Sequence, residues 1–181
     1  MKINLARSWF QRNIRSQVPI IIYPRVYPTR QVWPVEREES NFRDLNIYGK
    51  LLRSYIVFDK PHIALELTIQ NPGHTTITRI DVTLYQNRSL GGKKGRVTIF
   101  QDSLAGIVDF QNEYLHRTFQ IPIRYQYGLL PPTSYWKNTG KLFNKSWTVE
   151  YVLEVTFRTR LFFTNATLTF PIMVVTSEHR V

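Results

Sequence analysis

Residues 147–158 read Trp147-Thr148-Val149-Glu150-Tyr151-Val152-Leu153-Glu154-Val155-Thr156-Phe157-Arg158, an unbroken alternation of apolar and mostly polar side chains. A period of two places successive side chains on opposite faces of a β-strand. The apolar set is Trp147, Val149, Tyr151, Leu153, Val155 and Phe157. We therefore expect one long strand with these six side chains facing a core and with Glu150 and Glu154 facing solvent.

The same alternation recurs on both sides of this strand. It is clear in residues 63–70 and 77–86, which are separated by a turn at Asn71-Pro72-Gly73-His74, and it returns in 97–100, 115–123 and 166–175. Residues 104–113 fit one helical face as well as a strand. Seven or eight short strands joined by turns are typical of an antiparallel, immunoglobulin-like β-sandwich, which we place over residues 46–176.

The composition agrees with an all-β fold. The chain has 16 Ile, 14 Val and 17 Thr against only 4 Ala, so strand-favouring residues far outnumber the best helix former. It contains no cysteine, which excludes disulfides, thiolate catalysis and Cys-ligated metal sites.

The first 45 residues differ from the rest of the chain. Residues 1–24 predict a β-hairpin, with a turn at 11–13 and a second strand at 18–23. Residues 25–45 predict a linker, because Pro28 and Pro34 interrupt regular structure and the charged run 36–41 has no apolar period. Residues 177–181 are assigned to a short tail.

The charge is strongly basic, with 24 Lys and Arg against 13 Asp and Glu, a net of +11. Such a surface favours nucleic acid, anionic lipid or acidic protein partners. The best local cluster is Lys93, Lys94 and Arg96, next to the glycine-rich stretch 91–95. We interpret it either as a solvated loop or as a contact for anionic lipid or a phosphorylated tail.

The sequence offers no catalytic, metal or cofactor motif. The four histidines are scattered and lack metal-ligand spacing. The stretch 91–95 lacks the spacing and the Lys-Ser/Thr pair of a phosphate loop, and no catalytic signature is found elsewhere. We therefore expect a protein that is not an enzyme.

Four stretches in order resemble the C-terminal domain of the arrestin family, closest to the α-arrestin (arrestin-domain-containing) branch. They are residues 48–72 with Ile69-Gln70-Asn71-Pro72 at their end, residues 76–86, residues 120–134 with Pro122 and the pair Pro131-Pro132, and the two closing runs 149–155 and 170–174. Residues 1–24 resemble the last hairpin of an arrestin N-terminal domain, so the chain looks like the later part of a longer arrestin.

The resemblance implies a non-enzymatic adaptor in membrane-protein trafficking, endocytosis or ubiquitination. Its expected partners are an integral membrane cargo protein and ubiquitin-ligase or endocytic machinery, and its expected location is cytoplasmic, peripheral to the plasma membrane or endosomes. The alternative is a basic β-domain that binds single-stranded nucleic acid, since basic and aromatic residues suit phosphate contacts and base stacking. A third interpretation is a secreted lectin-like sandwich, which the N-glycosylation sequons at Asn87, Asn144 and Asn165 would fit.

Overall fold

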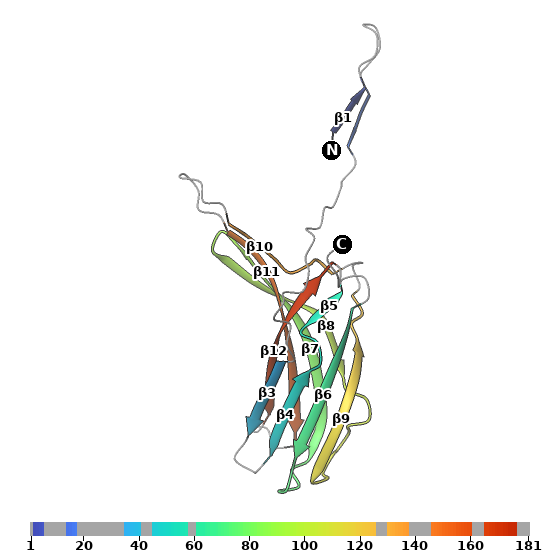
Figure 1. Cartoon of the computed structure of the whole chain (residues 1–181), viewed down its shortest axis with the longest axis vertical. Helices are drawn as coiled ribbons and strands as arrows, with labels where there is room; N and C mark the ends of the chain where they lie inside the picture. Colours follow the sequence, from blue (N-terminus) through green and yellow to red (C-terminus); the bar gives the residue numbers. More distant parts are fainter. Residues whose placement is uncertain are drawn as a thin grey trace.

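The chain is an all-β sandwich (Figure 1). The computed structural model describes residues 2–5, 14–17, 35–40, 45–57, 61–125, 130–137, 146–160 and 165–176, with the backbone alone for the first two ranges. These residues form twelve strands and contain no helix, so the described part of the chain holds no helix that could cross a membrane.

The larger sheet has the strand order β5-β12-β11-β7-β8, with β10 added to the edge of β11. Its strands are β5 Tyr55–Val57, β7 Ile77–Leu90, β8 Lys93–Ser103, β10 Ser134–Lys137, β11 Ser146–Thr159 and β12 Ala166–Val175. All pairings are antiparallel except that of β5 with β12, which is parallel. The expectation of a purely antiparallel sandwich is therefore wrong at this one edge.

The smaller sheet has the order β3-β4-β6-β9 and is antiparallel throughout. Its strands are β3 Val35–Ser40, β4 Asn46–Leu51, β6 His62–Gln70 and β9 Tyr114–Pro122. The predicted linker at 25–45 is wrong over 35–40, because this charged segment pairs with β4 from Val35↔Leu51 to Ser40↔Asn46. The sandwich therefore includes β3, eleven residues before the start that we expected.

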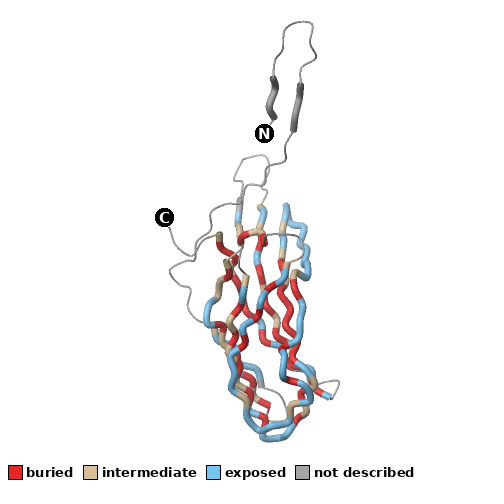
Figure 2. Tube along the Cα trace, turned by 90° about the vertical axis from the view of Figure 1, so that its right-hand side faces the viewer, coloured by how far each residue is buried: buried red, intermediate tan, exposed pale blue. Residues whose placement is uncertain are grey.

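The core lies between the two sheets, where the inward residues of β4, β6, β7, β11 and β12 are buried, while β8 contributes only Phe100 (Figure 2). The prediction that alternate residues of 147–158 face the core is confirmed for five of them, which are buried: Val149, Tyr151, Leu153, Val155 and Phe157. Glu150 is exposed and Glu154 is partly exposed, as the alternation predicts.

Trp147 is wrongly predicted as a core residue, since it stays 37% exposed. It pairs with Leu90 at the end of the larger sheet, and Leu90 is itself exposed. Figure 1 shows this end reaching beyond the smaller sheet, so no opposing layer covers it.

Two other segments complete the fold. β1 (Lys2–Leu5) and β2 (Ile14–Gln17) pair with each other in a separate two-stranded sheet. A hairpin is therefore present, but its second strand is 14–17, and the expected strand at 18–23 lies outside the described residues. The ambiguous residues 104–113 form no helix; Leu104 and Ile107 are buried against the core from an irregular connection.

Candidate functional site

A groove of about 380 Å³ lies on the larger sheet where β7, β8 and β11 run side by side. The strand registers bring its lining residues together. Asn87 of β7 pairs with Arg96 of β8 and with Glu150 of β11, and Ser89 pairs with Lys94 and Thr148. Its lining consists of Asn87, Arg88, Ser89, Lys94, Gly95, Arg96, Thr148 and Glu150. We call it the basic groove.

The turn between β7 and β8 fixes the position of the lysines. Leu90 pairs with Lys93, so only Gly91 and Gly92 form the loop, with φ of 56° and 86°. A two-residue hairpin turn of this kind needs positive φ at both positions, which glycine adopts without steric cost. The Gly91 amide also donates to the Ser146 carbonyl at 3.0 Å, which ties the turn to the start of β11.

The three predicted basic residues do not act as one cluster. Lys94 and Arg96 line the basic groove, whereas Lys93, the residue next to Lys94, points to the other face of the sheet. The Arg96 guanidinium lies 3.6 Å from the Tyr85 ring centroid and donates to the Glu154 carboxylate. Arg96 is therefore partly neutralised, while Lys93 and Lys94 are exposed and form no ion pair with any described residue.

Sequence reasoning could not place Arg88, which lines the groove from β7. Its side chain donates to Gln86 Oε1, and Gln86 Nε2 donates to the Tyr151 hydroxyl. That hydroxyl donates in turn to the Pro131 carbonyl, so the network anchors the Pro131-Pro132 segment to the sheet. The network fits a structural role for the paired prolines.

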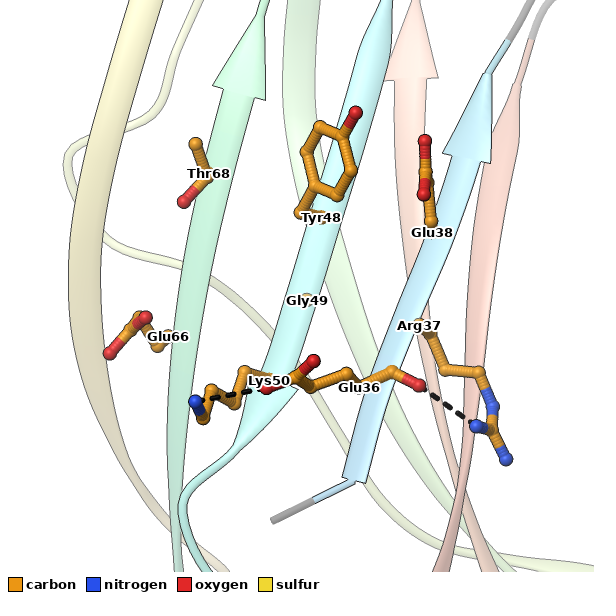
Figure 3. A pocket seen from close by; sticks show the side chains of 8 residues that line it. All are labelled: Glu36, Arg37, Glu38, Tyr48, Gly49, Lys50, Glu66 and Thr68. Carbon is orange, nitrogen blue, oxygen red and sulfur yellow. Dashed lines mark hydrogen bonds and ion pairs between the residues drawn. The ribbon is translucent and has the colours of Figure 1, made fainter.

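A second groove, of about 410 Å³, lies on the outer face of the smaller sheet (Figure 3). It is lined by Glu36, Arg37, Glu38, Tyr48, Gly49, Lys50, Glu66 and Thr68. It was missed from the sequence, since the segment containing Glu36, Arg37 and Glu38 was assigned to a linker.

Charges in this second groove neutralise one another. Lys50 Nζ lies 2.9 Å from Glu36 Oε1, and the hydrogen bond and charge of Glu36 raise the pKa of Lys50. A hydrogen bond to Glu38, together with the charge of that residue, raises the pKa of Tyr48. Figure 3 shows Lys50 and Glu36 directed toward each other and Arg37 on the side of β3 away from Lys50.

His74 and His116 make local hydrogen bonds. His116 Nδ1 lies 2.9 Å from Thr68 Oγ1, and His74 Nδ1 lies 3.0 Å from the Gln111 carbonyl. Within the residues that the structure describes, no three His, Asp or Glu side chains come together in a metal-binding arrangement. His179 lies outside the described residues.

A scan of the sequence against models of known protein families finds no match, and a search of curated proteins finds no relative.

Proposed function

We propose that the chain is a non-enzymatic, arrestin-like adaptor whose sandwich is built like the immunoglobulin-like C-terminal domain of that family. It binds an integral membrane cargo protein and connects it to ubiquitin-ligase or endocytic machinery, at the cytoplasmic side of the plasma membrane or endosomes. Three features support this proposal: the all-β sandwich, the order of the four arrestin-like stretches, and a surface suited to anionic partners.

The observation that carries the proposal is the exposed pair Lys93 and Lys94. Arg96 is paired with Glu154 and stacked on Tyr85, whereas Arg88 donates to the neutral Gln86, which holds its side chain without cancelling its charge. The two lysines keep their full charge available at the start of an edge strand. Each exposed lysine near an anionic membrane surface contributes about 1 kcal/mol to binding.

Vesicle sedimentation tests this surface. The full chain should sediment with phosphatidylcholine vesicles that contain phosphatidylserine, and it should stay in solution with phosphatidylcholine alone. Lys93→Glu/Lys94→Glu should reduce the bound fraction on the order of 10-fold, since two attractive charges become repulsive. Arg160→Glu is the control for charge, because Arg160 is 70% exposed and lies at the opposite end of β11.

Cell experiments test the adaptor role itself. Proximity labelling with the full chain should mark integral membrane proteins together with ligase or endocytic components, and the lysine variant should mark fewer of them. Labelling of soluble proteins alone would contradict the proposal. Binding of a fluorescent single-stranded oligonucleotide more tightly than vesicles would favour the nucleic-acid alternative.

A further inference from the structure

Two of the four edge strands of the sandwich, β3 and β8, carry opposite charges. β3 pairs only with β4 and β8 pairs only with β7 among the described strands, so each has one free edge of backbone donors and acceptors. β3 carries Glu36, Glu38 and Glu39, whereas β8 begins with Lys93, Lys94 and Arg96. Opposite charges on two open edges favour pairing between them.

The two edges cannot meet within one molecule. β3 contacts β12, while β8 lies at the far side of the larger sheet, beyond β11 and β7. The two edges also belong to different sheets. Pairing therefore requires a second copy of the chain.

We propose that β3 of one molecule adds as an antiparallel strand to β8 of another. One register makes the two strands complementary at every position from 35 to 39. It sets Glu39 opposite Lys93, Glu38 opposite Lys94, Arg37 opposite Gly95, Glu36 opposite Arg96, and Val35 opposite Val97. Glu36 and Arg96 already have partners within the molecule, Lys50 and Glu154, so the new charge attraction comes mainly from Glu38 and Glu39 with Lys94 and Lys93.

The facing of the side chains agrees with this register. Glu36 and Glu38 share the solvent face of their sheet with Lys50 and Tyr48, and Lys94 shares the solvent face of the other sheet with Arg96. Opposed residues of paired strands lie on the same face, so each acid meets its base on the same surface. If the register of β3 against β8 shifted by one residue, each side chain would lie opposite a side chain of the other face of the sheet. A shift of two residues would leave only one acid–base pair.

Two further details bear on the same arrangement. The Arg37 guanidinium donates to the Thr169 and Glu36 carbonyls beside the edge of β3, so an added strand must displace it, and Gly95 opposite has no side chain that would obstruct this movement. In β8 the pairing with β7 skips one residue at Ile99. This bulge ends the regular edge after Thr98, leaving a six-residue segment that matches the length of β3.

The resulting contact is heterologous, because different edges of the two molecules meet. After one contact forms, the pair of molecules still has one unpaired β3 edge and one unpaired β8 edge, so further molecules add and the size of the linear assembly depends on protein concentration. The acid–base pairs are exposed, so salt weakens the association. Lys94 also lines the basic groove, so an assembled β8 edge is closed to the anionic partners of a free molecule.

Charge exchange tests the pairing in the full chain. By sedimentation velocity at low salt, the average mass of the wild type should rise with concentration and return to monomer in about 0.5 M salt, where charges are screened within a few ångströms. Glu38→Lys/Glu39→Lys and Lys93→Glu/Lys94→Glu should each stay monomeric alone. An equal mixture should associate again, because each variant supplies the edge that the other lacks.

A cysteine pair tests the register. The chain has no cysteine, so Val35→Cys and Val97→Cys, mixed under mild oxidation, report only this contact. They should give a disulfide-linked dimer, while Val35→Cys mixed with Val108→Cys, a residue 76% exposed in the loop after β8, should not. A wild type that stays monomeric, or folded charge variants whose mixture stays monomeric, would overturn the proposal and assign the β8 edge to another partner.

Discussion

Arg37 and Thr169 join the two sheets of the sandwich: Arg37 Nε donates to the Thr169 carbonyl at 3.1 Å, across 132 residues of sequence. Arg37 belongs to β3 of the smaller sheet and Thr169 to β12 of the larger one. The guanidinium also donates to the Glu36 carbonyl at 2.8 Å, which holds it along the strand. The bond ties β3 to the larger sheet through a side chain and shows that residues 35–40 belong to the folded domain.

We predict that the stable domain begins at residue 35. Deleting residues 1–34 should leave the melting temperature nearly unchanged, because β1 and β2 pair only with each other among the described strands. Deleting residues 1–40 also removes the β3–β4 ladder and the Arg37 bond, and it should lower the melting temperature by on the order of 5 °C. Equal melting temperatures for the two deletions would contradict a structural role for β3.

Arg37→Ala isolates the contribution of the inter-sheet bond. We expect the free energy of unfolding to fall by about 1 kcal/mol, since the bond involves a charged donor but lies at the surface. Urea denaturation measures the change, and Arg124→Ala, an exposed arginine just after β9, is a control for the loss of a surface charge. An effect no larger than that of the control would show that the bond contributes little.

The long strand supplies a test of the core. Leu153 is fully buried, so Leu153→Ala should lower the free energy of unfolding by about 2–5 kcal/mol. Val152→Ala, on the partly exposed opposite face, should cost much less. Chemical denaturation of both variants measures the difference, and similar losses would mean that the facing of β11 is wrong.

The sequence predicted most of the sandwich because its long strands carry a strict alternation. It failed at β3, where Val35 is the one apolar residue and the strand is defined by backbone pairing with β4. An edge strand with a charged surface has little apolar pattern to reveal it. It also failed at the three-residue β5, which is too short to show a period.

The basic groove could be predicted only in part. Lys94 and Arg96 are two residues apart, so local alternation places them on one face. Glu150 joins them because the β7–β8 and β7–β11 registers place Arg96 and Glu150 on either side of Asn87, and these registers are set by pairing between distant segments. The same alternation places Lys93 and Lys94 on opposite faces of the sheet. The sequence did not predict this, because residues 91–95 were interpreted as a loop and not as the start of a strand.

A close approach at Gly49 explains why β4 has no side chain there. A Cβ at this position would lie 2.6 Å from Leu168 Cδ1 and 2.8 Å from Phe170 Cζ, both fully or nearly fully buried in the opposite sheet. Gly49→Ala should lower the free energy of unfolding by about 1–3 kcal/mol through overpacking. Gly95→Ala is the matched control, since nothing lies within 4 Å of its Cβ position.

Asp81 is the centre of a charged cluster at the other end of β7. Its carboxylate oxygens lie 3.2 Å from Arg79 Nε and 3.0 Å from Arg158 Nε, and it accepts a 2.9 Å hydrogen bond from Ser103 Oγ. Burial alone would raise the pKa of Asp81. The hydrogen bonds from Arg158 and Ser103 and the charges of both arginines outweigh burial, so the pKa is lowered.

This lowered pKa predicts how acid destabilises the domain. A carboxyl whose pKa is lower in the folded state stabilises the fold above its unfolded pKa of about 3.9 and loses that contribution as the pH falls through the folded value. The free energy of unfolding should therefore drop between about pH 5 and pH 2.

Asp81→Asn should be less stable than wild type at pH 7 and should show a smaller drop in the free energy of unfolding between about pH 5 and pH 2. Glu150→Gln, which removes an exposed carboxylate that has no ion pair among the described residues, should follow the wild-type curve. An acid-induced loss of stability that is identical in Asp81→Asn and wild type would show that Asp81 does not contribute to the pH dependence.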